Sequence, residues 1–152
     1  MKKLVTYFSV EYKNTDKIAK AIAKELDADI FEIIPKEPYS QKDINWRNPI
    51  SRCNREFFAK KEVEAQGTIE NINEYDEIYV GFPIWYGCAP LVVSTFLKGL
   101  DLKGKKIYVF ATSGGSGIGK TAQKLAPFVE GAEIVDAQLT QTVEEALAYI
   151  KK

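Results

Sequence analysis

The sequence contains no histidine, and it has two cysteines and one methionine among 152 residues. Without histidine the chain cannot build a Ser/His/Asp or Cys/His nucleophilic triad or a histidine-ligated metal site, and it lacks the commonest general base. Cys53 and Cys88 are too few and too far apart for a disulfide framework, a CxxC redox pair or a zinc site. If the protein carries out chemistry, we therefore expect a cofactor to supply it.

Long apolar runs and an excess of one charge are also missing. No run approaches the ~20 apolar residues that a membrane-spanning helix needs. The start, MKKLVTYFSV, leads into a strand-like segment without a signal-peptide cleavage pattern. Lys plus Arg and Asp plus Glu each number 21, so the net charge draws the chain neither to nucleic acid nor to anionic lipid. We expect a soluble, cytoplasmic protein that binds neither nucleic acid nor membranes.

Apolar residues make up 45% of the chain and aromatics 12%, which is enough for one packed core. Short β-branched and aromatic runs alternate with apolar residues at helical spacing. The runs predict strands over residues 3–8, 29–34, 77–82, 106–111 and 133–137. The helical spacing predicts helices over residues 15–26, 51–65, 90–97, 119–128 and 143–150. In the last helix we expect a capping box of Thr142 and Glu145 and a buried stripe of Val143, Ala146, Leu147 and Ile150.

Strands that alternate with helices, without a linker or repeat, predict parallel βαβ units in a single domain over residues 1–152. The sheet is then open and covered by helices on both faces. Ligands of such sheets bind at the carboxyl ends of the strands, where the winding direction reverses. Three unusual loops, residues 9–15, 83–87 and 112–117, follow the first, third and fourth strands. We therefore expect these loops to meet at one edge of the sheet.

The first of these loops has the groups that a phosphate needs. Ser9, Asn14 and Thr15 lie where a strand gives way to a helix, and a helix N-terminus offers free N–H groups and a favourable dipole to an anion. Asn14 and Thr15 are also ordinary helix caps. Lys13 can pair with a phosphate or point into water.

The second loop carries two adjacent aromatic side chains, Trp85 and Tyr86, between Pro83 and Gly87. Loops that follow a buried strand lie on the surface and often carry function. Two rings held there can form a wall for a flat ligand, or one of them can simply cap the core.

The third loop allows two interpretations. Residues 114–121, GGSGIGKT, match the nucleotide-triphosphate pattern GxxxxGK[ST], with Lys120 on the phosphates and Thr121 on magnesium. A P-loop usually follows the first strand, however, and here only Asp136 on the last strand remains as a magnesium-binding acid. Alternatively, the backbone amides of residues 112–116 bind the polar edge of a ring. A flat ring with a single phosphate, such as FMN, suits the three loops together better than a triphosphate.

At the level of motifs the chain resembles the flavodoxin family, particularly small bacterial flavodoxins with PIW[WY]G and TSGGSG. The matching segments are YFSxxxxNT, EIIPKEPYS, NWRNPISRCNRE, GFPIWYG and FATSGGSGIG, which together cover essentially the whole chain. The resemblance implies a flavodoxin-like three-layer α/β sandwich with a five-stranded parallel sheet in the order 2-1-3-4-5, and noncovalently bound FMN. It implies cofactor contacts at Ser9, Tyr12, Lys13, Asn14, Thr15, Pro83, Ile84, Trp85, Tyr86, Gly87, Thr112, Ser113, Gly114, Gly115 and Ser116.

Two features depart from the family. Its S-x-T-G-N-T loop has six residues and a glycine, whereas SVEYKNT has seven and carries Lys13 at the glycine position. Flavodoxins are also usually acidic, which steers them to basic redox partners, whereas this chain has a net charge of zero.

The resemblance predicts a low-potential electron carrier that exchanges electrons with redox partner proteins as a monomer or weak dimer, with no catalytic side chain and no metal. The alternative is an FMN-dependent NAD(P)H oxidoreductase acting on quinones or nitro compounds, with residues 45–55 lining its pocket. A P-loop phosphotransferase is a third hypothesis. A receiver-like signalling module is a fourth, but it needs an aspartate at the end of the third strand, where Gly81, Phe82 and Pro83 stand.

Overall fold

The computed structural model of the chain describes residues 2–9, 14–34, 65–84, 89–112, 118 and 121–151. Within these residues the chain forms one parallel sheet of five strands in the order β2-β1-β3-β4-β5. The strands are β1 (Lys2–Tyr7), β2 (Asp29–Glu32), β3 (Tyr75–Pro83), β4 (Lys106–Thr112) and β5 (Glu133–Leu139). The predicted fold class and strand order are confirmed.

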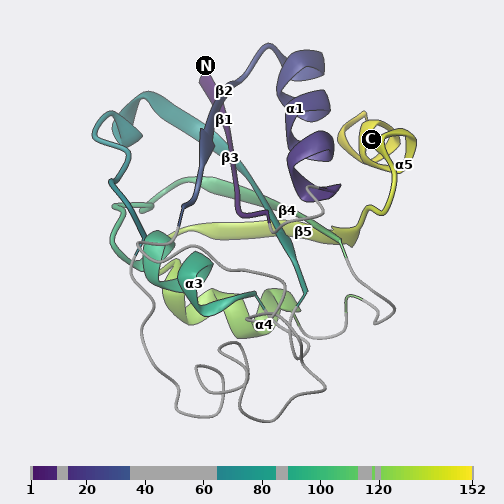
Figure 1. Cartoon of the computed structure of the whole chain (residues 1–152). Coiled ribbons are helices and arrows are strands. Elements are labelled where there is room, and N and C mark those ends of the chain that lie inside the picture. The colour runs from purple at the N-terminus through teal and green to yellow at the C-terminus, as the bar shows by residue number, and fades with distance from the viewer. Residues whose placement is uncertain are drawn as a thin grey trace, which may run out of the picture.

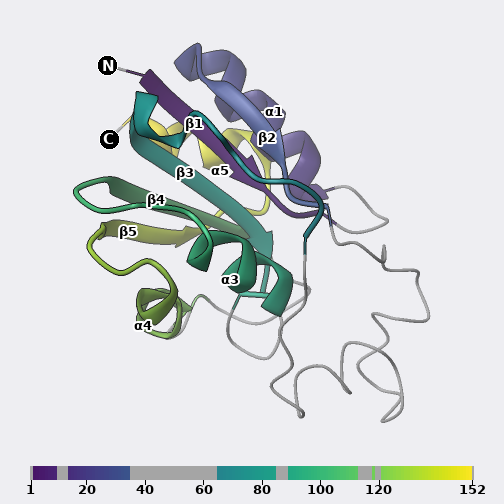
Figure 2. The same cartoon turned by 90° about the vertical axis from the view of Figure 1, so that its left-hand side faces the viewer.

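Helices cover both faces of this sheet. They are α1 (Asn14–Leu26), α3 (Leu91–Lys98), α4 (Thr121–Leu125) and α5 (Val143–Ile150), with 3-10 turns η1 (Ile72–Glu74) and η2 (Ala126–Phe128). Helices α1 and α5 lie on one face, and α3 and α4 lie on the other (Figure 1, Figure 2). The helix predicted over residues 51–65 falls outside the described residues except for its last position.

Two apolar cores result from this arrangement, one on each side of the sheet. Neighbouring strand residues point to opposite faces, so Val5 and Tyr79 pack under α1 and α5 while Leu4 and Ile78 pack under α3. All four are at most 5% exposed. A strand that is buried on both faces must be apolar at nearly every position, which is why these strands are continuous apolar runs in the sequence.

The last two helices differ from the prediction. Helix α4 ends at Leu125 and continues as the 3-10 turn η2, because Pro127 has no N–H to donate to an α-helical carbonyl. In α5 the Glu145 N–H donates to Thr142 Oγ1 at 3.1 Å, as the capping box predicts. The predicted stripe is wrong at Val143, which is 38% exposed, whereas Tyr149 is 7% exposed. A tyrosine ring can take an inward position as well as an aliphatic side chain does.

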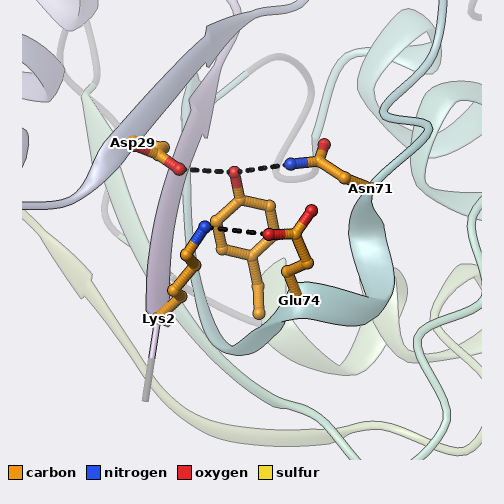
Figure 3. A network of polar contacts seen from close by, with 5 residues as sticks. Lys2, Asp29, Asn71 and Glu74 are labelled. Atoms are coloured by element: carbon orange, nitrogen blue, oxygen red, sulfur yellow. Dashed lines mark hydrogen bonds and ion pairs between the residues drawn. The ribbon is translucent and has the colours of Figure 1, made fainter.

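A polar network joins the amino-terminal ends of three strands, opposite the edge that the loops leave. The buried Tyr75 hydroxyl donates to Asp29 Oδ2 at 2.6 Å and accepts from Asn71 Nδ2 at 3.3 Å. Beside it, Lys2 Nζ lies 2.8 Å from Glu74 Oε1 (Figure 3). The network links the start of β2 to the segment that enters β3.

Replacing Tyr75 with phenylalanine should lower the free energy of unfolding by about 1 kcal/mol, because it removes both hydrogen bonds of a buried hydroxyl without changing the ring. Urea denaturation measures this change. The control is Lys2→Ala, which breaks an ion pair whose side chains are 57% and 49% exposed and should change stability little. Equal effects of the two substitutions would contradict this role of Tyr75.

Buried tyrosines under α5 give the fold a sensitivity to alkaline pH. The rings of Tyr79 and Tyr108 stack with centroids 4.8 Å apart. Burial, followed by the charge of Glu77, raises the pKa of Tyr79 to about 12. Burial also raises the pKa of Tyr149, whose hydroxyl has no hydrogen-bond partner among the described residues.

Because these pKa values are higher in the folded state than the ordinary value of about 10, the folded protein keeps protons that the unfolded chain releases. The stability they contribute is complete below pH 10 and should be lost as the pH rises through about 12. Denaturation at pH 8, 10, 11 and 12 measures this loss. Tyr79→Phe should flatten the curve between pH 10 and 12, and an unchanged slope would contradict the assignment to Tyr79.

Candidate functional site

The carboxyl ends of β1, β3 and β4 lie side by side at one edge of the sheet. Tyr7 is in register with Gly81, and Pro83 with Thr112. Backbone pairing continues past the strands, since Phe8 N–H donates to the Gly81 carbonyl at 2.9 Å and Ile84 N–H donates to the Thr112 carbonyl at 2.8 Å. The three loops singled out in the sequence therefore begin at neighbouring points.

Ser9, the last described residue before the first loop gap, is tied to helix α1. Its Oγ accepts from the backbone N–H of Asp16 at 3.3 Å, in the first turn of the helix. A serine hydroxyl in this position satisfies one of the N–H groups that a helix start leaves without a partner. This hydrogen bond joins the described residues on either side of the first loop, Ser9 and Asp16.

The first turn of α1 also contains a carboxylate, Asp16, which is engaged on both of its oxygens. The Tyr7 hydroxyl donates to Oδ1, and Lys20 Nζ lies 3.0 Å from Oδ2, one helical turn on. Tyr7 is 3% exposed, and burial raises the pKa of its hydroxyl, with the hydrogen bond to Asp16 as the second cause. The hydroxyl therefore stays protonated and donates to the carboxylate at neutral pH.

Thr15 and Thr112 join the first loop to the third. Their Oγ1 atoms lie 2.9 Å apart, and the two residues are 2% and 4% exposed. Thr15 lies in the first turn of α1, whereas Thr112 is the last residue of β4. The hydrogen bond thus fixes the start of the helix to the end of a strand two places away in the sheet from β1.

The second loop leaves β3 beside a close contact between the sheet and an aromatic ring. A Cβ at Gly81 would lie 2.2 Å from the Phe110 ring, so this position accepts only glycine without rearrangement. Ile84 is 7% exposed and packs in the core under α3, which leaves its backbone, rather than its side chain, to face a ligand. Pro83 is half-buried.

Several predicted site residues lie outside the described residues. They are Tyr12, Lys13, Trp85, Tyr86, Gly87, Ser113, Gly114, Gly115 and Ser116, together with the side chain of Asn14. Of the predicted site, the structure therefore places Ser9, Thr15, Pro83, Ile84 and Thr112, and it brings these together at one edge.

The geometry argues against the P-loop interpretation of residues 114–121. Thr121, its magnesium ligand, is fully buried, and its hydroxyl donates to the Ile118 carbonyl. Asp136 lies three residues before the end of β5, and its Oδ1 accepts from the neighbouring Ala137 N–H. A hydroxyl that is buried and donates to a carbonyl in the turn before α4 is poorly suited to bind magnesium.

Sequence reasoning missed the roles of Tyr7, Asp16 and Lys20. Asp16 and Lys20 are four residues apart, which is a readable ion-pair signal on a helix. The sequence does not indicate the role of Tyr7, because an aromatic residue at the end of an apolar strand is typical of a buried core side chain.

Two kinds of feature are absent from the described residues. No group of three or more Asp, Glu or Cys side chains within them is arranged to hold a metal ion. Among the helices described, none has the length and apolar character to cross a bilayer.

Comparisons with known proteins agree with this architecture. A candidate flavoprotein from Bacteroides uniformis is 34% identical, with 99% of this chain and 98% of that chain covered and a TM-score of 0.91. A second, from Bacteroides eggerthii, is 33% identical over 99% and 96% of the two chains, with a TM-score of 0.86. A flavoprotein from Lactobacillus acidophilus, solved in complex with FMN, shares the fold at 22% identity, with 99% of each chain covered and a TM-score of 0.77.

A curated relative is an uncharacterized protein of Methanocaldococcus jannaschii, 34% identical over 114 residues. The match takes in 75% of this chain but spans only 55% of that protein's length. The family model described as flavodoxin matches residues 2–150, which is nearly the whole sequence. The strand order and this match over nearly the whole sequence lead to one conclusion, that the chain belongs to the flavodoxin family.

Proposed function

We propose that the protein binds FMN at the carboxyl edge of β1, β3 and β4 and acts as a low-potential electron carrier. The observation that carries the proposal is the linkage at Thr112, whose hydroxyl meets Thr15 and whose carbonyl accepts from Ile84 N–H. One residue thereby joins described end residues of the three loops. A ligand with a phosphate at one end and a flat polar ring at the other spans such a site.

The described residues fit the phosphate end of FMN. Helix α1 is 13 residues long, and the dipole and backbone N–H groups at a helix N-terminus favour an anion. The carboxylate that would repel a phosphate there, Asp16, is held by the Tyr7 hydroxyl and by Lys20. Ser9 adds a hydroxyl at the same end of the helix.

In this proposal the second and third loops bind the isoalloxazine ring of FMN. Trp85 follows directly after Ile84, whose backbone is fixed to β4 and whose side chain is buried. We propose that Trp85 and Tyr86, which follow Ile84 in the sequence, stack on the isoalloxazine. The backbone of residues 112–116 would hydrogen-bond the pyrimidine edge.

In this proposal FMN supplies the redox chemistry, and the chain binds it, orients it and tunes its potentials. The residues of the site would bind the phosphate and cover the isoalloxazine ring. One edge of the ring would stay open for electron exchange with partner proteins. We propose a cytoplasmic location and a monomer or weak dimer. A carrier needs no nicotinamide pocket, which is what separates it from the oxidoreductase alternative.

The direct test has two parts. Apo protein titrated with FMN should bind one equivalent and quench the flavin fluorescence, while ATP with magnesium should not bind. The loaded protein should then accept electrons from an added flavodoxin reductase and show no steady-state turnover with NADPH and a quinone when the reductase is omitted. Rapid turnover without the reductase would establish the oxidoreductase instead, and ATP binding without FMN binding would overturn the site.

A further inference from the structure

Two tyrosine rings on neighbouring strands form a stacked pair that the proposed function does not use. Tyr79 on β3 and Tyr108 on β4 are in register, their ring centroids lie 4.8 Å apart, and their planes differ by 13°. This separation matches the usual spacing of about 4.8 Å between paired strands, so the backbone itself holds the rings face to face. Among the described residues no other two tyrosines stack in this way.

We propose that Tyr79 and Tyr108 form an oxidation site, at which one-electron oxidants such as peroxyl radicals and high-valent metal complexes join the two rings as a dityrosine. The Glu77 carboxylate accepts the phenol protons. The product is a covalent bond between β3 and β4 within one molecule. The site does not depend on FMN, because each ring lies four residues before the carboxyl end of its strand.

The first argument is the orientation of the rings. The unpaired electron of a phenoxyl radical occupies an orbital perpendicular to the ring, with high density on the carbons ortho to the oxygen. Two such radicals form a bond when their faces approach each other, which is the arrangement of a stacked pair. The 13° angle keeps the two faces nearly parallel, and the pairing of β3 with β4 from Glu77 to Pro83 limits their separation.

The second argument is access for the oxidant and an acceptor for the proton. Tyr108 is half-buried, whereas Tyr79 is 5% exposed, so an oxidant in solution reaches the pair through Tyr108. Loss of an electron makes a phenol strongly acidic, and a carboxylate within reach then takes its proton. Burial, followed by the charge and the hydrogen bond of Glu77, raises the pKa of Tyr108, which identifies Glu77 as that carboxylate. The Glu77 side chain is 18% exposed and can pass protons on to water.

Two equivalents of oxidant are consumed for each bond formed. Each oxidant takes one electron from a phenol, and the phenol proton leaves through Glu77, whose charge acts on both tyrosines. The ortho carbons of the two phenoxyl radicals then join, and the hydrogen on each of these carbons moves to the phenol oxygen, which restores both hydroxyls. The protein thereby loses two electrons and two protons, and the oxidant gains the two electrons.

The chain offers a matched control in the same core. Tyr149 packs with the pair under α5, and it is 7% exposed. It does not stack on another tyrosine within the described part of the chain. Tyr149→Phe therefore removes a phenol from this core without changing the stacked pair.

The experiment treats the protein with hexachloroiridate(IV), a one-electron oxidant, after the cysteines have been blocked with N-ethylmaleimide. Dityrosine fluorescence should appear in monomeric protein. Mass spectrometry of a tryptic digest should find the peptides of residues 62–98 and 107–120 joined to each other with the loss of two hydrogen atoms. Residues 107–120 contain Tyr108 as their single tyrosine, so the joined peptides identify one partner directly.

Four variants test the assignment. Tyr79→Phe and Tyr108→Phe should each abolish the joined peptides, whereas Tyr149→Phe should leave their yield unchanged. Glu77→Gln keeps both rings and removes the proton acceptor, so it should slow their formation several-fold.

Three results would overturn the site. They are consumption of the oxidant without dityrosine in the wild-type protein, a wild-type yield in Tyr79→Phe or Tyr108→Phe, and dityrosine found only in covalent dimers, which would come from exposed tyrosines of two molecules. An unchanged rate in Glu77→Gln would remove Glu77 from the step. Circular dichroism identifies any variant that fails to fold, in which case fragmentation of the joined wild-type peptides decides whether Tyr79 is the partner.

Discussion

Replacing Gly81 with alanine should lower the free energy of unfolding by about 3 kcal/mol, the upper part of the range for overpacked sites. The added Cβ would lie 2.2, 2.3 and 2.9 Å from three atoms of the Phe110 ring. Phe110 is fully buried in the core under α1 and cannot move aside without displacing its neighbours. Chemical denaturation measures the loss, which for a domain of this size corresponds to roughly 10 °C in melting temperature.

Two further variants make this prediction specific. Gly99→Ala is the control, because a Cβ at Gly99 would have its nearest contact at 3.5 Å and the residue has an ordinary helical φ of −78°. It should be neutral or slightly stabilising. Shortening the ring side chain in Gly81→Ala/Phe110→Leu should recover part of the lost stability. If Gly81→Ala is as stable as Gly99→Ala, the packing of β3 against Phe110 is not as described.

The largest effect on function should come from Trp85→Ala. In the proposed site its ring covers one side of the isoalloxazine, and stacking of an aromatic side chain on a base contributes about 1–3 kcal/mol. The FMN dissociation constant should therefore rise about 5- to 150-fold, and the midpoint potentials of bound FMN should shift as the ring becomes more solvated. Fluorescence titration measures the affinity, and anaerobic spectroelectrochemistry measures the potentials.

Trp85→Phe is the matched variant, since it keeps a stacking face and removes only the indole. It should retain most of the FMN affinity. Riboflavin should lose affinity for Trp85→Ala as strongly as FMN does, because the lost contact is to the ring and not to the phosphate. Wild-type affinity and potentials in Trp85→Ala would remove the second loop from the site.

Most of the fold could be predicted because the sheet is buried on both faces. Runs such as Leu4 with Val5, or Ile78 with Tyr79, mark the strands without ambiguity. Alternation with helices then leaves few topologies, and the flavodoxin motifs selected the strand order. The ends of strands were harder to predict. The apolar run predicts a second strand through Ile34, whereas β2 ends at Glu32.

The sequence predicts that the ends of three strands meet at one edge, but it does not predict the side-chain contacts made there. Strand order alone brings Ser9, Pro83 and Thr112 to one edge. Nothing in the sequence indicates that Thr15 would meet Thr112, because the two are 97 residues apart and the pairing depends on how α1 crosses the sheet. For the same reason Tyr7 read as a core residue, although its hydroxyl donates to a carboxylate in the helix start.

The exposed Val143 shows that the buried side of a helix is also hard to predict from sequence spacing alone. Its spacing with Ala146, Leu147 and Ile150 is helical, but the sheet surface that α5 covers is formed partly by tyrosine rings, and Tyr149 packs there instead. Periodicity identifies a helix, whereas the partner surface decides which of two adjacent stripes is buried.

The central claim is that a single FMN is held jointly by the start of α1, the loop after β3 and the loop after β4. A crystal structure of the protein grown with excess FMN tests it most directly. We expect the phosphate at the first turn of α1, near Ser9, and the isoalloxazine against the loop that follows Ile84. An FMN bound elsewhere on the molecule, or no FMN at this edge of the sheet, would contradict the account.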